Sequence, residues 1–252
     1  MFNSPILGYN SKEGIVYQFW ANRDSHDVNY FDPKTDYAPT TAISSVSWDD
    51  SNFPNIEGFG VWAAKCNFTM GPDGKMYSRM LGGNLVRIDV ENARGENLTN
   101  GDLVGTKDGS AYGLVFDPQD ENVFYFSNND KHCIYKYDLR TKEWACWAGQ
   151  EGKSGYLDGP IGQAMFNKPG QMCVDSEGNI ILTDTENHCI RKITMSTGYV
   201  STLAGKPQNS GYVNGSAEDA QFKKPLGICI DNDDVMYIGD SENRAIRRLA
   251  VE

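Results

Sequence analysis

Short runs of alternating apolar and polar residues, separated by turn residues, extend along most of the chain. The run GQMCVD at residues 170–175 is followed by the turn SEGN and a second apolar run, IILTD. A polar turn, TEN, then leads to CIRKI, and the run YVSTLAG follows at residues 199–205. Alternation with a period of two residues between turn signals is typical of β-strands, and no segment keeps a helical period over three turns. The pattern predicts an all-β chain built from four-stranded units.

The four-strand pattern recurs along the chain. The segment that begins at Lys168 aligns with the segment that begins at Lys224, and the matches are Pro169 with Pro225, Cys173 with Cys229, Asp184 with Asp240, Asn187 with Asn243 and Arg191 with Arg247. A third clear copy contains His132-Cys133-Ile134, and two weaker copies begin at Asn67 and Ser4. A four-stranded unit of this length predicts a β-propeller with one blade per repeat. We place five repeats approximately at residues 4–58, 59–109, 110–166, 167–222 and 223–252, within a single propeller domain that covers residues 1–252.

The segment PGQMCVDSEGNIILTDTENHCIRKI, from Pro169, resembles the NHL repeat. The connector pattern STLAG…SGY…(Asp/Asn)-Gly…Ala-x-Phe-x-x-Pro narrows this resemblance to bacterial cell-envelope proteins in which a TIG (IPT) domain precedes an NHL propeller. The resemblance covers most of residues 60–252. It implies an NHL-type β-propeller with six blades in the native form, and an extracytoplasmic or cell-surface location in a bacterium.

The last repeat contains only three predicted strands, which would leave one edge of its sheet open. In the family, the fourth strand of that blade comes from sequence before the first blade. We therefore expect that an N-terminal TIG domain and a first blade are absent from this chain. A five-bladed ring that closes in another way is the alternative.

Composition narrows the possible partners. The formal net charge is −11, and no basic run is present, so we expect no nucleic-acid partner. No apolar stretch is long enough to span a bilayer, and the N-terminus lacks the features of a signal peptide. The six cysteines form no CxxC pair and are predicted to be free, buried thiols.

The histidines are the first candidates for chemistry. His26, His132 and His188 occupy the same repeat position, so a propeller would spread them around its ring, and we expect no shared metal site. Nucleophile-elbow, P-loop, zinc-protease and dinucleotide-binding motifs are absent from the sequence. We therefore predict no catalytic residue and no cofactor.

Polar and aromatic residues on one face of the propeller are the candidates for ligand binding. Asn128, Asp184 and Asp240 end the second strand of their repeats, and Lys168 and Lys224 precede the first strand, where we expect them near the axial mouth and facing the aspartates. The candidate aromatic residues are Trp62 and Tyr112. The structural alternatives are that the aspartates close their hairpins with the asparagines of the following turn, and that the lysines form ordinary ion pairs.

These observations predict a non-enzymatic binding module that takes a glycan or a protein on its propeller face. The first alternative is a propeller hydrolase or lyase with an active site in the axial funnel. The second alternative is a scaffold for protein–protein contacts, because a fold by itself does not determine function.

Overall fold

The computed structural model describes residues 6–10, 15–21, 26–31, 33–36, 39–43, 47–48, 69–79, 85–89, 94–99 and 112–250. The chain divides into two compact units, residues 1–108 and 109–252. In the described part of the chain the regular elements are β-strands and short 3-10 turns, namely η1 (Pro33–Thr35), η3 (Thr185–Asn187) and η4 (Ser241–Asn243). The prediction of an all-β chain is confirmed.

The first unit contains two sheets. One has the order β1-β2-β3-β4, with β1 at Ile6–Asn10, β2 at Ile15–Ala21, β3 at His26–Phe31 and β4 at Pro39–Ile43. The other has the order β5-β9-β8-β7-β6, with β5 at Ser47–Trp48, β6 at Thr69–Met70, β7 at Met76–Arg79, β8 at Leu85–Asp89 and β9 at Arg94–Asn97. Consecutive strands in both sheets are antiparallel, whereas β5 runs parallel to β9.

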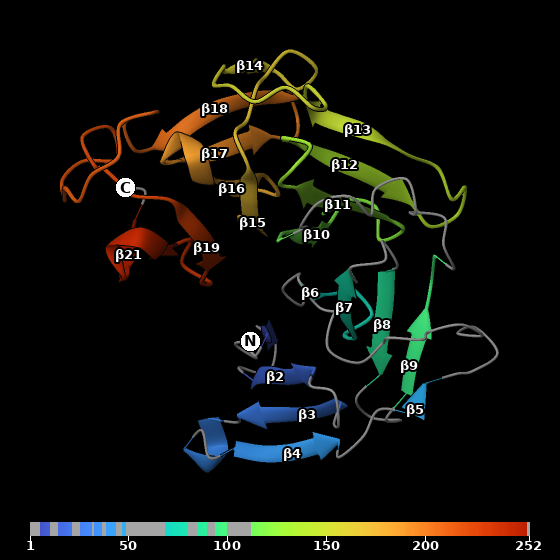
Figure 1. Cartoon of the computed structure of the whole chain (residues 1–252). Coiled ribbons are helices and arrows are strands. Elements are labelled where there is room, and N and C mark those ends of the chain that lie inside the picture. Colours follow the sequence, from blue (N-terminus) through green and yellow to red (C-terminus); the bar gives the residue numbers. More distant parts are fainter. Residues whose placement is uncertain are drawn as a thin grey trace. The chain divides into compact units, whose positions relative to one another are not determined.

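The second unit contains three sheets (Figure 1). The first consists of β10 (Leu114–Phe116), β11 (Val123–Asn128), β12 (Cys133–Asp138) and β13 (Trp144–Gly149). The second consists of β15 (Pro169–Val174), β16 (Ile180–Asp184), β17 (Cys189–Thr194) and β18 (Tyr199–Ala204), with β14 (Gly159–Pro160) added outside β18. The third consists of β19 (Pro225–Ile230), β20 (Met236–Asp240) and β21 (Ala245–Leu249).

The three sheets of the second unit are arranged as successive propeller blades. Their first strands lie side by side, because β15 contacts both β10 and β19, and the later strands fan outward from them (Figure 1). Each sheet is an antiparallel meander, as the repeat predicts. The prediction of a β-propeller built from four-stranded blades is confirmed.

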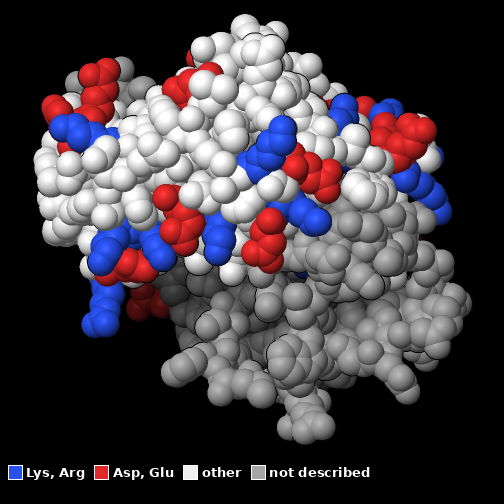
Figure 2. Space-filling view, turned by 45° about the horizontal axis from the view of Figure 1, so that its top comes forward, with Lys and Arg blue, Asp and Glu red and all other residues white. Residues whose placement is uncertain are grey.

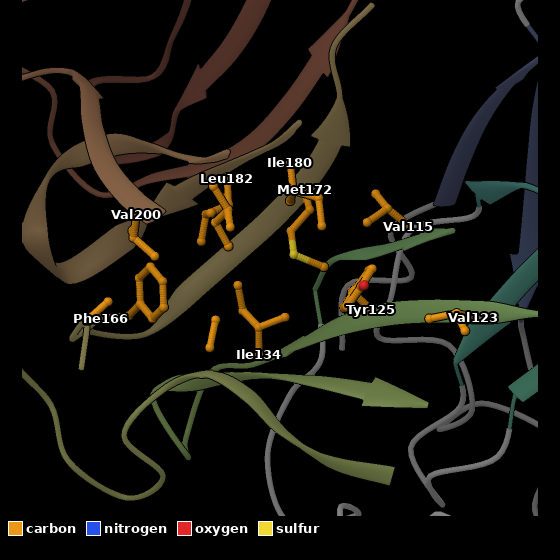
Figure 3. Close-up of a cluster of buried hydrophobic side chains, with 12 residues drawn as sticks. Val115, Val123, Tyr125, Ile134, Phe166, Met172, Ile180, Leu182 and Val200 are labelled. Atoms are coloured by element: carbon orange, nitrogen blue, oxygen red, sulfur yellow. The ribbon is translucent and has the colours of Figure 1, made fainter. Parts of the chain in front are cut away.

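Alternation along each strand places apolar side chains against both neighbouring sheets. In the middle sheet, Ile180 and Leu182 pack with Tyr125 and Ile134 of the preceding sheet, as Figure 3 shows. Ile181, between them in sequence, instead belongs to the cluster shared with the third sheet, which contains Ile190, Phe222, Ile228 and Ile238. Successive residues of a strand point to opposite faces, so one strand contributes to two cores.

The connector between two repeats also joins the next sheet, which the repeat pattern did not predict. After leaving β13, the chain pairs Gly159 and Pro160 with β18 at the outer edge of the following sheet, and then returns inward to Pro169. In the first unit, β5 likewise pairs with the outer strand β9 of the following sheet.

One stability prediction compares two residues that occupy the same repeat position. Ile190 is completely buried in the core shared by two sheets, whereas Ile246 is 80% exposed. We expect Ile190→Ala to lower the free energy of unfolding by about 2–5 kcal/mol, because it removes packed methyl groups and leaves a cavity. Ile246→Ala should change it by less than about 0.5 kcal/mol. Chemical denaturation of both variants tests this, and equal losses would contradict the assignment of the core.

Candidate functional site

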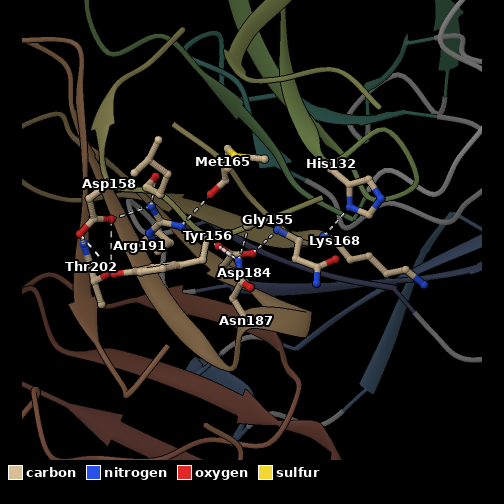
Figure 4. Close-up of polar contacts among 12 residues, drawn as sticks. His132, Gly155, Tyr156, Asp158, Met165, Lys168, Asp184, Asn187, Arg191 and Thr202 are labelled. Atoms are coloured by element: carbon tan, nitrogen blue, oxygen red, sulfur yellow. Dashed lines mark hydrogen bonds and ion pairs between the residues drawn. The ribbon is translucent and has the colours of Figure 1, made fainter. Parts of the chain in front are cut away.

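Asp184, at the end of β16, lies inside the protein rather than on its surface. Its Oδ1 accepts the backbone N–H of Asn167 at 2.8 Å. Its Oδ2 accepts hydrogen bonds from Nδ2 of Asn187 at 2.8 Å and from Nη1 of Arg191 at 2.7 Å (Figure 4). The side chain is fully buried, so a ligand could contact this carboxylate only after the network opened.

Arg191 on β17 connects this carboxylate to the preceding connector. Its Nη1 also donates to the carbonyl of Met165 at 3.2 Å, and its Nη2 donates to the carbonyl of Leu157 at 3.0 Å and to Asp158 at 2.6 Å. The guanidinium carbon lies 4.9 Å from the ring centre of Tyr156, a cation–π distance. Arg191 therefore holds the connector against the sheet through both its charge and its hydrogen bonds.

The third sheet repeats the arrangement. Oδ2 of Asp240 accepts hydrogen bonds from Asn243 at 2.8 Å and from Nη1 of Arg247 at 3.0 Å, and its Oδ1 accepts the backbone N–H of Lys223 at 2.7 Å. Arg247 also donates to the carbonyl of Val213 at 2.7 Å. The aspartates therefore bond the following turn, as the structural alternative expected, and they also anchor the connector.

The first sheet of this unit replaces both members of the ion pair with neutral residues. Asn128 is buried at the position of Asp184, and its Oδ1 accepts the backbone N–H of Lys131 at 3.1 Å. Tyr135 stands where Arg191 stands in the next repeat, and its hydroxyl donates to Glu151 at 2.7 Å. Removing only one partner of a buried ion pair would leave an uncompensated charge, and in this sheet both positions are neutral.

Burial raises the pKa of Asp184 to about 6, while Arg191, Asn187 and the N–H of Asn167 act in the opposite direction. Both carboxylate oxygens accept hydrogen bonds from N–H donors, one of which is the Arg191 guanidinium, and this geometry favours the charged form. Its role in this geometry is to neutralise a buried guanidinium.

The histidines connect one sheet to the next. Nδ1 of His132 accepts the backbone N–H of Lys168 at 3.1 Å, and Nδ1 of His188 accepts that of Lys224 at 3.2 Å. All four residues have a positive φ of between 49° and 59°. A left-handed backbone costs about 1–2 kcal/mol for a residue with a Cβ, so these bonds hold two strained turns together. Burial, followed by the charge of Lys168, lowers the pKa of His132 and keeps its ring neutral.

The two lysines have different partners. Nζ of Lys224 lies 3.3 Å from Glu186 and 3.1 Å from Glu242, so it pairs with these glutamates and not with the aspartates that the sequence suggested. Within the described part of the chain, Lys168 has no ion pair, and its side chain extends away from the buried network (Figure 4). The glutamates recur in the TEN and SEN turns, which was the sequence signal for this pairing.

The aromatic candidates are only partly placed. Tyr112 is half-buried and lies immediately before β10, at the end of the first strand where Lys168 and Lys224 also lie in their sheets. Trp62 lies outside the described residues. We use the name connector face for the surface formed by Tyr112, Lys168 and Lys224 with the turns at residues 129–132 and 185–188.

The described residues were also compared with the requirements of a metal site and a membrane span. No group of three or more His, Cys, Asp and Glu side chains is arranged to hold a metal ion in this part of the chain, and no helix in it is long and apolar enough to cross a membrane. Acidic and basic side chains alternate on the surface seen in Figure 2 and form no basic patch there. The described cysteines are free thiols, of which Cys133 and Cys189 are buried and Cys229 is exposed, and Cys66 lies outside the described residues.

Comparison with known proteins places this geometry among NHL repeats. The NHL repeat family matches residues 166–193, the segment that contains Asp184, Asn187, His188 and Arg191. The protein SUPPRESSOR OF QUENCHING 1, chloroplastic, from Arabidopsis thaliana is 25% identical over 98% of the chain and 25% of its own length.

Two crystal structures from Bacteroides thetaiotaomicron are similar in fold. One is a protein of unknown function, with a TM-score of 0.80 and 24% identity over 98% of the chain and 58% of its own. The other is an auxiliary nutrient binding protein, with a TM-score of 0.63 and 23% identity over 99% of the chain and 69% of its own. The chain thus spans a quarter of the length of the curated relative.

The buried ion pair gives a mutational prediction. Asp184→Asn keeps the shape of the side chain but leaves Arg191 with Asp158 as its acidic partner. We expect it to lower the free energy of unfolding by about 3 kcal/mol, because the buried guanidinium loses its fully buried counter-charge. Asp120→Asn, which removes an exposed ion pair with Arg140, is the control and should leave the denaturation midpoint nearly unchanged. Comparable effects of the two variants would contradict the role of the buried pair.

The histidine contacts predict a dependence on pH. The pKa of His132 is lowered in the folded state, so the stability that its Nδ1 contributes is present above the unfolded pKa of about 6.5 and is lost as the pH falls through the folded pKa. An NMR titration should therefore give a pKa below about 6.5 for His132. The His132→Ala variant should lose stability at pH 7 and show a flatter decline on acidification. A normal or raised pKa for His132 would contradict this prediction.

Proposed function

Because the chain contains an NHL repeat and folds as an NHL-type β-propeller, we propose that it is a non-enzymatic binding module that takes a glycan on its connector face. The observation that carries this proposal is the contrast between the two lysines. Lys224 is held between two glutamates, whereas the ammonium group of Lys168 has no ion-pair partner in the described residues.

The surroundings of Lys168 favour a ligand with several oxygen atoms. Its backbone is fixed by His132 in a left-handed conformation just before Pro169, so the base of the side chain is rigid. An ammonium group donates up to three hydrogen bonds, and hydroxyl or carboxylate oxygens of a sugar can accept them. Tyr112 adds an aromatic ring at the same end of the first strands, and such rings provide apolar contact with a polar group at the edge.

The other polar groups of the network support binding rather than catalysis. The carboxylates of Asp184 and Asp240 are buried and bonded to arginines, and His132 and His188 use Nδ1 to accept backbone N–H groups. The description of a similar propeller as an auxiliary nutrient binding protein supports a role in binding a ligand. We place the module in the cell envelope of a bacterium, where protease treatment of intact cells would test its exposure.

Affinity electrophoresis tests the function directly. The protein is run through gels cast with a panel of plant and host polysaccharides, and the same mixtures are assayed for released sugar. We expect retardation by at least one polymer without release. Lys168→Ala, Tyr112→Ala and Trp62→Ala should each weaken the retardation, about tenfold in dissociation constant for the lysine, the loss expected for one charged hydrogen bond.

A matched control removes one positive charge at the other end of the sheet. Arg140 lies in the turn between β12 and β13, opposite the connector face, and pairs with Asp120 and Asp138. Arg140→Ala should leave the retardation unchanged. Release of sugar would favour a hydrolase or lyase, and the absence of retardation on every polymer would leave a protein as the ligand of this face.

A further inference from the structure

Two cysteines occupy neighbouring strands in the first sheet of the second unit. Cys133 is the first residue of β12, and Cys146 lies in the middle of the antiparallel strand β13. Cys146 pairs directly with Tyr135, and Cys133 lies two residues before Tyr135 on the same strand. Residues two apart in a strand point to the same face of the sheet. The two cysteines therefore share one face and are diagonal neighbours across the strand pair.

The thiol of Cys146 points towards Cys133. Its Sγ donates to the carbonyl oxygen of Gly149 at 3.6 Å, and Gly149 is the residue that pairs with Cys133. A hydrogen bond between the two thiols raises the pKa of Cys133 and lowers the pKa of Cys146. The buried thiol of Cys133 thus stabilises a thiolate on Cys146, and the two sulfurs are in contact.

A β-bulge lies beside this contact. The register between β12 and β13 shifts between Ile134 and Tyr135, which leaves Trp147 outside the ladder. Trp147 packs on the opposite face of the sheet, where its ring centre lies 4.2 Å from that of Tyr125. A bulge bends its strand and interrupts the ladder of hydrogen bonds. The outer strand β13 can therefore move towards the start of β12 without breaking a continuous ladder.

The two thiols differ in access and in surroundings. Cys133 is buried and Cys146 is half-buried. The hydroxyl of Tyr135 donates to Glu151 at 2.7 Å, and the charge of Glu151 acts to raise the pKa of both thiols, whereas the backbone of Glu151 acts to lower the pKa of Cys146. The nucleophile in thiol–disulfide exchange is a thiolate, so Cys146 is the thiol that attacks and Cys133 is the thiol that follows.

The repeat shows that the fold does not require this pair. In the next sheet Cys189 occupies the position of Cys133, but Thr202 occupies the position of Cys146. In the third sheet Ala245 occupies the position of Cys133. The same sheet therefore forms with alanine at the first position or with threonine at the second.

The other described cysteines lack this arrangement. Cys173 and Cys229 occupy equivalent positions on β15 and β19, and burial raises the pKa of both. Burial also raises the pKa of Cys189. Among the cysteines that the structure describes, Cys146 is thus the one whose pKa is lowered, and its neighbour is another thiol.

We propose that Cys133 and Cys146 are a reversible dithiol–disulfide pair that reacts with small-molecule disulfides. The thiolate of Cys146 attacks one sulfur of the small disulfide, which forms a mixed disulfide and releases one small thiolate. Cys133 then gives its proton to the released thiolate and attacks the sulfur of Cys146, and the second small thiolate leaves and takes up a proton from water. In total, two protein thiols are oxidised to one disulfide, and one small disulfide is reduced to two thiols. This reaction goes beyond the proposed binding of a glycan and does not depend on it.

Mapping of the oxidised protein tests the proposal. The fully reduced 252-residue protein is incubated with excess oxidised glutathione without denaturant, and the remaining thiols are blocked with N-ethylmaleimide in acid. Trypsin can cut after Lys136, Arg140 and Lys142, so a bond between the two cysteines joins separate peptides that mass spectrometry identifies. We expect a linked pair that contains Cys133 and Cys146, and we expect dithiothreitol to restore both thiols.

Variants taken from the repeat separate the two steps. Cys133→Ala keeps the attacking thiol but lacks the second one, so a mixed disulfide with glutathione should persist on Cys146, whereas in the unchanged protein it should disappear. Cys146→Thr should abolish the bond and leave Cys133 as a thiol. Cys189→Ala is the matched control, because Cys189 is also buried and has the same repeat position as Cys133, and it should form the bond as the unchanged protein does. Circular dichroism with denaturation checks that each variant folds.

Three results would overturn the proposal, and the unchanged protein alone can give each of them. The first is recovery of Cys133 and Cys146 as thiols under excess oxidised glutathione. The second is a bond from either of them to Cys66, Cys173 or Cys229 in place of the bond between them. The third is a bond between Cys133 and Cys146 that forms only in urea, which would assign the reaction to the unfolded chain.

Discussion

The second unit depends on two buried guanidinium groups, which must find hydrogen-bond acceptors within the protein. Arg191 and Arg247 are removed from water, and most of the N–H groups of each must therefore find acceptors within the protein. Those acceptors are an aspartate at the end of the second strand and carbonyls of the connector that precedes the sheet. The arginine of each sheet thus fixes the position of the connector that precedes that sheet. The path of the connector and the position of its outer strand both depend on it.

The contacts between sheets follow from the geometry of strands. A single four-stranded sheet exposes apolar residues on both faces, so it is stable only between neighbours, as Ile180 and Ile181 show by packing in opposite directions. Hydrophobic packing alone does not fix the angle between two sheets. Two hydrogen bonds between neighbouring sheets add a directional contact: the backbone N–H of Lys168 donates to His132, and that of Lys224 donates to His188. They also hold turns whose left-handed conformation would otherwise be unfavourable.

The same network defines what is left for a ligand. Most of the polar residues that recur at the ends of the strands serve the fold, because a propeller has many strand ends that must be tied to the next connector. Residues that do not form the ion pairs of their repeat equivalents are available to a ligand. Lys168 is such a residue, whereas its equivalent Lys224 pairs with Glu186 and Glu242.

The sequence by itself determined the all-β fold, the four-strand repeat and the equivalence of residues between repeats, because period-two alternation and turn residues are local properties of the chain. It also placed the pairs Asp184–Asn187 and Asp240–Asn243, which lie three residues apart. It could not determine that Asp184 is buried beneath Arg191, that Lys224 pairs with glutamates, or that a connector strand lies outside β18. The lysine pairing and the connector strand join segments far apart in sequence, and the burial of Asp184 and Arg191 depends on the connector packed over them. They were decided only by tertiary structure, because burial and pairing depend on which surfaces the packed sheets exclude from water.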